Sequence, residues 1–459
     1  MSINEQNNIK DLFKAYDIRG LSPQELNPKV AYNIARAYAD FLPAGKVAVG
    51  YDMRKDSRKL SQAFIRGLVR QGREVLDIGM VTSDMVYYAV GKHNLAGGAM
   101  ITASHNPKGY DGIKLTGKGV VPIGIDSGLL QIESEVETQS FKIKDKAHSD
   151  QVAEQDITEE WVKHAISIAG DITEPLQIGI DTGNGMAGII VPYLEKLLPN
   201  IHISSLYLDL DGSFPNHPAN PLVSKNNQDL QRLVVKEKLD CGIAFDGDGD
   251  RAFFIDDLGN ILSSSVVGAI IARDILEESP GETILYSATC SDILPATIES
   301  FGGKSTRVRV GHSFIKSQMR KRKAAFAAEH SGHFYYQQNY FADSGIITAI
   351  RVLSILSQSG KKLSEISAPF THIFANSEEL NFDFDSLEDT QDSLMMLERH
   401  FSDGDIDHLE GLTVRYRDWW FNARTSNTES YLRVNIEADN QQLLEEKQKL
   451  ITRLLRKYS

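Results

Sequence analysis

The chain has 459 residues, of which 41% are hydrophobic and 24% charged, and its formal net charge is −13. This length exceeds a single core and predicts about three or four domains of ordinary globular composition. The negative charge disfavours nucleic acid and acidic membrane surfaces as partners. No apolar run is long enough to cross a membrane, and the polar N-terminus lacks a secretory segment. We therefore expect a cytoplasmic protein.

The two cysteines, Cys241 and Cys290, are too few for a disulfide scaffold, and no histidine at close spacing completes a zinc site. We expect both thiols to be reduced and half-buried.

The first part of the chain alternates between helical and extended patterns. Residues 28–42 and 59–70 carry apolar residues at helical spacing, and residues 46–51 read as a strand between them. This alternation predicts a mostly parallel sheet with helices on both faces. Before it, Arg19 precedes Gly20 and could present its guanidinium to an anion.

A short apolar strand, Ala99–Ile101, runs into the loop Thr102-Ala-Ser-His-Asn-Pro. Open α/β sheets bind ligands at the carboxyl ends of their strands. We therefore expect Ser104 at an exposed tip, as a nucleophile or phosphate carrier. The alternative is an ordinary turn in which the serine bonds only its own backbone. Lys114, ten residues further on, could return to the same site.

Two further loops follow in the second part of the chain. A strand at residues 177–180 leads into the glycine-rich stretch 181–188, which lacks the lysine of a Walker motif and the spacing of a dinucleotide fingerprint. We interpret it as a tight strand-to-helix turn. Residues 211–221 contain too many prolines for regular structure and predict an ordered loop.

The sequence Asp246-Gly-Asp-Gly-Asp-Arg follows a strand predicted at residues 240–245. Glycines that adopt positive φ would allow Asp246, Asp248 and Asp250 to surround one hard cation. An EF-hand would require glycine where Arg251 stands and a bidentate glutamate where Asp257 stands. A solvated acidic loop is the other alternative. Mg²⁺ fits best, with room left for water or a phosphoryl oxygen.

The third part of the chain repeats the strand–loop–helix order in residues 282–301, and a strand at Val308–Val310 is expected before His312. A histidine at a strand end suits an acid or a base. The basic cluster at residues 320–323 is short and reads as a solvated helix end rather than a nucleic-acid patch.

The segment from Phe326 alternates in a way that would place Glu329, Ser331 and His333 on one face. Such a row could bind sugar hydroxyls or form a half-exposed strand face. Residues 345–358 predict a helix, and residues 361–369 predict a linker.

The last part of the chain begins with the acidic stretch 383–410, which we interpret as solvated surface, and ends in a helix from about residue 440. Between them, one loop combines the planar guanidinium group of an arginine with hydroxyl groups and an amide. These are phosphate-binding groups, although an ordinary hairpin turn is the alternative. The residues are Arg424, Ser426, Asn427 and Thr428.

In this order, four stretches resemble the motifs of the α-D-phosphohexomutases: Thr102–Pro107, Asp246–Arg251, Glu329–His333 and Arg424–Glu429. The chain is most similar to the bacterial phosphomannomutase/phosphoglucomutase branch. The resemblance implies three similar mixed-sheet α/β domains and a smaller C-terminal α+β domain, in a heart shape around a central cleft. The expected domains are 1–150 with the phosphoserine, 151–254 with the metal, 255–367 for sugar recognition and 368–459 for the phosphate clamp.

The resemblance also implies roles. Ser104 would be the phosphoserine and, together with Asp246, Asp248 and Asp250, would hold Mg²⁺. Glu329, Ser331 and His333 would bind the sugar, and the clamp of Arg424, Ser426, Asn427 and Thr428 would hold the non-reacting phosphate. The groups at the reacting phosphoryl group would be Arg19, His105, Lys114, Arg251 and His312, with either His312 or Lys114 as the general base.

Three positions depart from the family pattern. Ala328 replaces a usual glycine, Ser430 replaces a usual proline, and Thr289 stands where a lysine is common. The last change puts in doubt how the third domain holds phosphate. Asn427 favours the mannose/glucose branch, because phosphoglucosamine mutases usually have glycine there.

The activity implied is the interconversion of mannose 6-phosphate and mannose 1-phosphate through a hexose 1,6-bisphosphate. Hexose phosphates would be the only partners of a monomer or weak dimer. The alternatives are a phosphoglucomutase or dual-specificity enzyme, a catalytically silent sugar-phosphate-binding relative, and a metal-dependent phosphatase. We further expect the last domain to close on the cleft about a hinge near residues 366–370.

Overall fold

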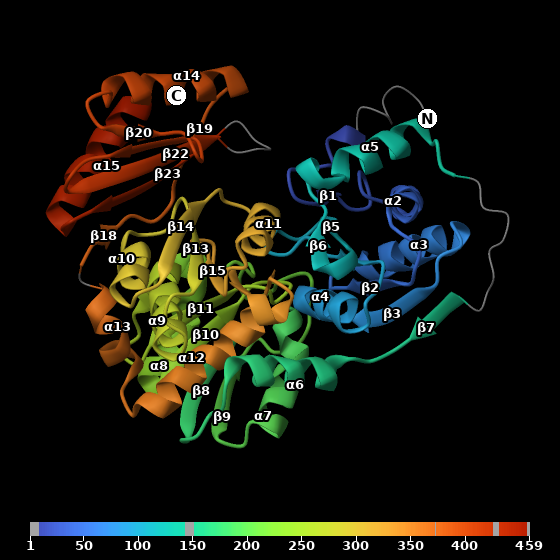
Figure 1. The fold of residues 1–459 in the computed structure, drawn as a ribbon, viewed down its shortest axis with the longest axis horizontal. Coiled ribbons are helices and arrows are strands. Elements are labelled where there is room, and N and C mark those ends of the chain that lie inside the picture. The colour runs from blue at the N-terminus through green and yellow to red at the C-terminus, as the bar shows by residue number, and fades with distance from the viewer. Residues whose placement is uncertain (1–8, 143–150, 372, 426–430, 457–459) are drawn as a thin grey trace.

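The computed structural model describes residues 9–142, 151–371, 373–425 and 431–456. These residues form four β-sheets, one in each of four domains. The blue first domain and the red fourth domain lie on opposite sides of the view in Figure 1, and the green second and yellow third domains lie between and below them. Within the described ranges, no helix has the length and apolar character needed to cross a membrane.

The first sheet has the strand order β1-β5-β4-β2-β3-β7, with β6 paired to β5. Its strands are β1 (Ile18–Leu21), β2 (Val47–Tyr51), β3 (Val75–Met80), β4 (Gly97–Ile101), β5 (Tyr110–Gly117), β6 (Val121–Pro122) and β7 (Val152–Glu154). The helices of this domain are α2 (Pro28–Phe41), α3 (Ser57–Arg70), α4 (Ser83–Lys92) and α5 (Leu129–Thr138).

The second sheet has the order β12-β11-β10-β8-β9. Its strands are β8 (Leu176–Asp181), β9 (Ile201–Leu206), β10 (Cys241–Phe245), β11 (Ala252–Asp256) and β12 (Ile261–Leu262), and the helices are α6 (Thr158–Ala169), α7 (Val191–Leu197) and α8 (Gln228–Glu237).

The third sheet has the order β14-β13-β15-β16-β17. Its strands are β13 (Thr283–Ser287), β14 (Lys304–Val308), β15 (Phe326–Ala328), β16 (Phe334–Tyr336) and β17 (Ala342–Asp343). Its helices are α9 (Ser264–Glu278), α10 (Ile293–Ser300), α11 (His312–Arg322), α12 (Gly345–Ser359) and α13 (Leu363–Thr371).

The fourth sheet is antiparallel throughout the described residues and carries two long helices. Its elements are β18 (Ala375–Asn376), β19 (Leu380–Asp383), α14 (Leu387–His400), β20 (Asp405–Asp407), β21 (Leu412–Arg415), β22 (Trp419–Thr425), β23 (Tyr431–Ala438) and α15 (Gln441–Leu455).

The first three sheets share one plan, which confirms the expected set of similar mixed-sheet domains followed by an α+β domain. In each, parallel strands are joined at one side by an antiparallel hairpin: β4 with β5, β10 with β11, and β15 with β16. Each hairpin turn carries one of the sequence motifs. The fold therefore presents three motifs from three equivalent loops.

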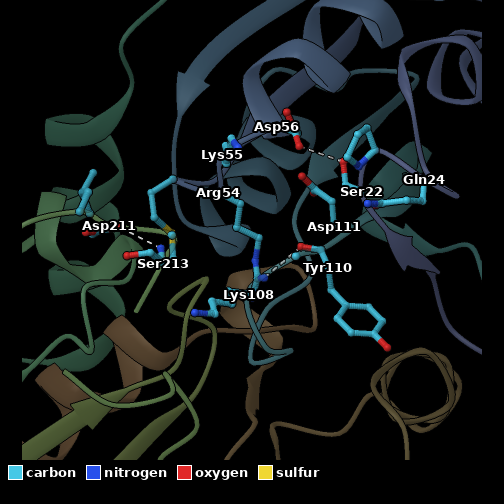
Figure 2. Close-up of a pocket in the computed structure, with 15 residues that line it drawn as sticks. Ser22, Gln24, Arg54, Lys55, Asp56, Lys108, Tyr110, Asp111, Asp211 and Ser213 are labelled. Carbon is cyan, nitrogen blue, oxygen red and sulfur yellow. Dashed lines mark hydrogen bonds between the residues drawn. The ribbon is translucent and has the colours of Figure 1, made fainter. Parts of the chain in front are cut away.

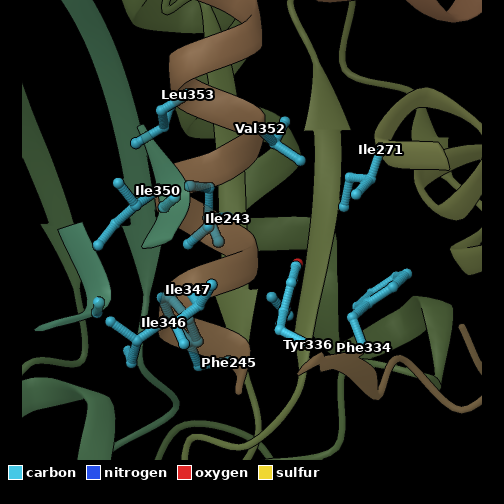
Figure 3. Packing of buried hydrophobic residues seen from close by; sticks show 14 of the residues in the cluster. Ile243, Phe245, Ile271, Phe334, Tyr336, Ile346, Ile347, Ile350, Val352 and Leu353 are labelled. Atoms are coloured by element: carbon cyan, nitrogen blue, oxygen red, sulfur yellow. The ribbon is translucent and has the colours of Figure 1, made fainter. Parts of the chain in front are cut away.

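Helix α12 lies at the centre of the largest core. Figure 3 shows Ile346, Ile347 and Ile350 of α12 beside Ile243 and Phe245 of β10. All five side chains are buried in an apolar cluster that also contains residues of the first domain. The fourth domain has a separate cluster of its own around Leu397 and Phe421. The first three domains are therefore held together by a shared apolar core, whereas the fourth domain has a core of its own.

The positions of two strands and one helix shift the expected domain boundaries. Strand β7 pairs with β3 of the first sheet, so that sheet extends past residue 150 to Glu154. A boundary after residue 254 would cut β11, and a boundary after residue 367 would cut α13. We propose boundaries near residues 155, 262 and 373.

The linker expected at residues 361–369 is wrong, because Leu363–Thr371 forms helix α13 with Pro369 inside it. A hinge at residues 366–370 would therefore have to break helical hydrogen bonds. Pro369 has no backbone N–H, so one of these hydrogen bonds is already missing from the last turn of the helix. The strand expected at residues 308–310 is also shifted, since β14 spans Lys304–Val308.

Cys241 and Cys290 are free thiols, as expected, but both are fully buried rather than half-buried. Burial raises the pKa of each thiol, to about 11 for Cys290, so both remain protonated at neutral pH.

Candidate active site

The three hairpin loops meet between the first three domains. The Ser104 hydroxyl lies 2.8 Å from Oδ2 of Asp246, which joins the first loop to the second. The backbones of Arg251 and His333 pair as an isolated antiparallel bridge, which joins the second loop to the third. The structure therefore brings together residues that are more than 200 positions apart in the chain.

Ser104 does not lie at an exposed tip, because only 2% of its surface is accessible. The aspartate loop covers it so closely that a Cβ at Gly247 would overlap the Ser104 carbonyl oxygen. Ser104 has a φ of 51°, a left-handed conformation that is unusual for a residue with a side chain. Its amide donates to the Thr102 hydroxyl over 2.9 Å. The serine is thus held in a strained and enclosed position.

The aspartate loop can hold a cation. One carboxylate oxygen from each of Asp246, Asp248 and Asp250 lies within 4.8 Å of the others, and all three side chains are buried. Oδ1 of Asp248 is buried and accepts no hydrogen bond. Gly249 has a φ of 75°, which turns the chain between the second and third carboxylates. Three buried carboxylates, two of which (Asp248 and Asp250) each keep an oxygen without a hydrogen bond, suit a hard divalent cation such as Mg²⁺.

Two cationic side chains balance these carboxylates. Nζ of Lys114 lies 2.6 Å from Oδ2 of Asp248 and 2.6 Å from Oδ2 of Asp250. Nη2 of Arg251 lies 2.7 Å from Oδ2 of Asp246 and donates to the Ser104 hydroxyl over 3.0 Å. A guanidinium that contacts the serine oxygen can stabilise negative charge on that oxygen.

The pKa values follow from burial and these pairs. Burial raises the pKa of Asp246 to about 7, against the effect of Arg251. Burial also disfavours charge on Asp248, but Lys114 lowers the pKa of that carboxyl. Burial likewise opposes charge on Lys114, yet Asp248 and Asp250 raise the pKa of the ammonium well above its usual value. Lys114 is therefore a cation here and cannot accept a proton.

His105 and Arg19 border the serine on its other sides. Nδ1 of His105 lies 3.3 Å from the Ser104 hydroxyl and contacts the Arg251 guanidinium. Burial, with Arg251, lowers the pKa of His105 well below its usual value. Arg19 bonds Asp17 over 2.8 Å and contacts the side chain of Asn106 in the serine loop.

The third loop is a turn, so the expected row on one strand face is wrong. Strand β15 ends at Ala328, and the Glu329 amide then donates to the His333 carbonyl over 3.0 Å. The turn still groups the three predicted side chains. Ser331 and Glu329 lie 2.8 Å and 3.5 Å from Nδ1 of His333. Gly332 has a φ of 88°, which permits this reversal and breaks the period of two.

Charges converge on His333 within that turn. Nε2 of His333 lies 3.5 Å from Oδ1 of Asp250, so the third loop contacts the aspartate loop. Burial opposes charge on the imidazole, but Asp250 raises the pKa of His333 to about 9. Glu329 accepts hydrogen bonds from Tyr335 over 2.8 Å and from the Gly311 amide over 3.0 Å.

His312 begins helix α11 and lies directly after Gly311, the donor to Glu329. Burial, with Lys316, lowers the pKa of His312 well below its usual value. The ring stacks edge-on with Tyr16, at 5.7 Å between centroids, and its two nitrogens make no hydrogen bond. A neutral imidazole with free nitrogens can accept a proton.

Arg424, the arginine of the predicted phosphate clamp, lies on β22 of the fourth domain. Arg424 donates to Asn435 over 3.0 Å and pairs with Glu379 over 2.5 Å. Burial lowers the pKa of the half-buried His330 of the third loop, and the charges of Glu379 and Arg424 also act on it. The other clamp residues, Ser426, Asn427 and Thr428, and the departure at Ser430, lie outside the described residues.

Thr289 and Ala328, two of the residues that depart from the family pattern, are both buried. The Thr289 hydroxyl lies 3.3 Å from that of Ser287, so it bonds a neighbouring side chain. The carbonyl oxygen of Ala328 accepts a hydrogen bond from Cys290.

A cavity of about 640 Å³ lies between the first and second domains. Figure 2 shows Arg54, Lys108 and Asp211 among the side chains that line it. None of the predicted site residues lines this cavity. It borders the serine loop only through residues 108–111, on the side where Arg54 lies.

The sequence interpretation missed several groups that complete the site. Ser83 donates to Oδ2 of Asp248 over 2.5 Å, and Lys316 pairs with Asp343 over 2.6 Å beside His333. Arg54 binds the serine loop from behind. Ser83 and Arg54 each follow a strand end, the same signal that identified the aspartate loop.

Family models for all four domains match the chain in order. They describe α/β/α domains I, II and III and the C-terminal domain of phosphoglucomutase/phosphomannomutase, at residues 10–143, 159–259, 263–373 and 379–454.

Individual relatives match over nearly the full length. The chain is 35% identical over 450 residues to the phosphohexose mutases of Xanthomonas campestris pv. campestris strain B100, covering 97% of this chain and 99% of that one. It is 34% identical over 434 residues to a phosphomannomutase of Escherichia coli, covering 93% and 94%. A crystal structure of a phosphoglucomutase/phosphomannomutase family protein from Burkholderia thailandensis superposes with a TM-score of 0.87 at 28% identity, covering 98% of both chains.

Proposed function

Because the chain belongs to the phosphoglucomutase/phosphomannomutase family and is an intramolecular phosphotransferase of the isomerase class, we propose that it interconverts mannose 6-phosphate and mannose 1-phosphate. The path runs through a phosphoserine at Ser104 and a hexose 1,6-bisphosphate. One observation carries this proposal: the Ser104 hydroxyl lies against both Asp246 and Arg251, in a buried site.

Phosphoryl transfer depends on position and charge more than on covalent work by the protein. The carboxylates of Asp246, Asp248 and Asp250 would hold Mg²⁺, which neutralises negative charge on the serine phosphate when it is bound. Arg251 donates to the serine oxygen and stabilises it as the phosphoryl group leaves. Burial of Ser104 excludes water and protects the phosphoserine from hydrolysis.

The sugar hydroxyl that attacks the phosphate must lose a proton. We propose His312 as the base, because burial keeps it neutral whereas Lys114 is held as a cation. Lys114 then acts as a charge between Asp248 and Asp250. Glu329 and Ser331, grouped by their turn, would accept or donate hydrogen bonds to the sugar hydroxyls.

The second half of the reaction requires the bisphosphate to turn over and return its other phosphate to Ser104. Arg424, with Ser426, Asn427 and Thr428, would bind whichever phosphate is distal. Sugar-binding groups that accept both orientations of the sugar discriminate weakly between the positions of its hydroxyl groups. Glucose phosphates, or both sugars, are therefore the alternative substrates.

A coupled assay tests the substrate directly by comparing mannose 1-phosphate with glucose 1-phosphate, each with a trace of its 1,6-bisphosphate. We expect a higher kcat/KM for mannose 1-phosphate, and the reverse order would make the protein a phosphoglucomutase. Release of inorganic phosphate without isomerised sugar would indicate a phosphatase. A purified chain whose intact mass shows no phosphate, and which converts neither sugar, would indicate a silent sugar-phosphate-binding relative.

A further inference from the structure

The serine loop is held from behind by one guanidinium. Nη2 of Arg54 donates to the carbonyl oxygens of Ser104 and Asn106 over 2.6 and 2.7 Å. Nη1 donates to the carbonyl oxygens of Pro107 and Tyr110 over 3.1 and 3.0 Å. One side chain thus satisfies four carbonyl groups of the loop that carries the proposed phosphate.

Arg54 is itself fixed on every side. Its side chain is 3% exposed, and its Nε lies 3.3 Å from Oδ2 of the fully buried Asp52. On the side of the second domain, the Phe214 ring covers the guanidinium at 5.1 Å. A Cβ at Gly212 would approach the Arg54 Cα to 2.7 Å, so this second-domain loop packs directly on the Arg54 backbone. Figure 2 shows Arg54 at the wall of the cavity, with its head directed toward Tyr110.

The loop needs such a partner. Ser104 has a left-handed φ of 51°, and residues 102–109 belong to no strand or helix that could pair their carbonyl groups. The hydrogen bond to the Ser104 carbonyl oxygen is buried, and a buried carbonyl must be paired. A strained residue also persists only where its surroundings hold it. A planar fork of five N–H donors can serve four oxygens at once, whereas an ammonium offers three donors from one point.

We propose that Arg54 is the positioning residue of the phosphate-carrying loop: it sets the place of the Ser104 oxygen between Asp246 and Arg251 without touching the substrate. The inference rests on the proposed role of Ser104. Its expected signature is a loss in kcat with little change in KM, because the loop reacts with the sugar but the clamp binds it.

Arg54→Lys and Arg54→Ala are compared with Arg73→Ala as the matched control. Arg73 lies in the same domain and also donates to backbone carbonyls, those of Ala39, Leu42 and Pro43, but it lies away from the serine loop. We expect kcat to fall about tenfold for Arg54→Lys and about 100-fold for Arg54→Ala, with KM within about twofold. Arg73→Ala should lower the melting temperature and leave kcat unchanged.

Chemical rescue separates positioning from stability. Methylguanidinium added to Arg54→Ala should restore part of kcat and should not affect Arg73→Ala. If Arg54→Ala does not fold, Asp52→Asn tests the same anchor, because it keeps the four carbonyl contacts while removing the charge beside Nε.

A kcat within about twofold of the wild type for Arg54→Lys and Arg54→Ala would overturn the proposal. An equal loss in Arg73→Ala, or no rescue by methylguanidinium, would do the same. The wild-type chain is measured alongside. If it carries no phosphate on the Ser104 peptide and isomerises no hexose phosphate, the proposed function fails first, whatever the Arg54 variants show.

Discussion

Gly345→Ala tests whether the third domain sets the geometry of the aspartate loop. Gly345 is the first residue of α12, and a Cβ there would lie 2.7 Å from the carbonyl oxygen of Gly249 and 2.8 Å from that of Arg251. Ordinary contact begins at 3.4 Å. Alanine therefore requires a displacement of about 0.7 Å between α12 and the loop.

This displacement falls on the aspartate loop, whose Asp246 and Arg251 side chains contact the Ser104 hydroxyl. Since a misplacement of about 1 Å can lower a rate about 100-fold, a shift of about 0.7 Å should lower kcat by about 10- to 100-fold. The same movement should raise the Mg²⁺ concentration needed for half-maximal activity. Helix propensity acts in the opposite direction, because alanine favours a helix over glycine by about 1 kcal/mol.

The assay is the coupled mutase reaction at saturating hexose phosphate, repeated over a range of Mg²⁺ concentrations. Gly117→Ala serves as the control, because a Cβ there meets its nearest atom, the Val121 carbonyl oxygen, at an ordinary 3.5 Å. The reasoning is wrong if Gly345→Ala keeps both kcat and the Mg²⁺ requirement within about twofold of the wild type.

Four further results are expected. Ser104→Ala should lower turnover at least about 100-fold in the coupled assay, and near-wild-type turnover would refute the phosphoserine. Arg424→Ala should mainly raise KM, because the bidentate contact between the guanidinium group and the substrate phosphate is lost. An unchanged KM would exclude Arg424 from the clamp. Dialysis against a chelator should abolish activity and added Mg²⁺ should restore it, and full activity after dialysis would remove the metal from the mechanism. Burial raises the pKa of Asp84 to about 8. Between about pH 4 and 8, the folded chain therefore keeps a proton on this carboxyl group that the unfolded chain has lost. The free energy of unfolding falls over this range by up to about 1.4 kcal/mol for each pH unit. Asp84→Asn, which keeps an acceptor for Ser344, should therefore melt higher than the wild type at pH 8 and not at pH 4; equal melting temperatures at both pH values would contradict this.

The positions of the motifs were predictable because they depend on local signals. A short apolar strand followed by small and polar residues marks a loop at a sheet edge, and the loops after β4 and β10 follow this rule. The alternation of helices and strands in the first domain was predictable for the same reason.

Features that depend on distant packing were not predictable. Ser104 is buried because Gly247, more than 100 residues away, lets the aspartate loop cover it. The turn at Glu329–His333 reads as an alternating strand until the positive φ of Gly332 is known. Helix α13 resembles a linker in sequence because it contains Pro369 and several polar residues, and its apolar side chains become buried only against other elements.

The separate core of the fourth domain has a consequence for catalysis. Its buried side chains pack among themselves, and its contacts with the third domain include ion pairs such as Arg415 with Asp292. Tilting this domain breaks polar contacts that water can replace, whereas tilting any of the other three would expose shared apolar surface. In the proposed reaction, in which the two ends of the sugar exchange places, the sugar can thus be released at its far end while the groups around Ser104 keep their spacing.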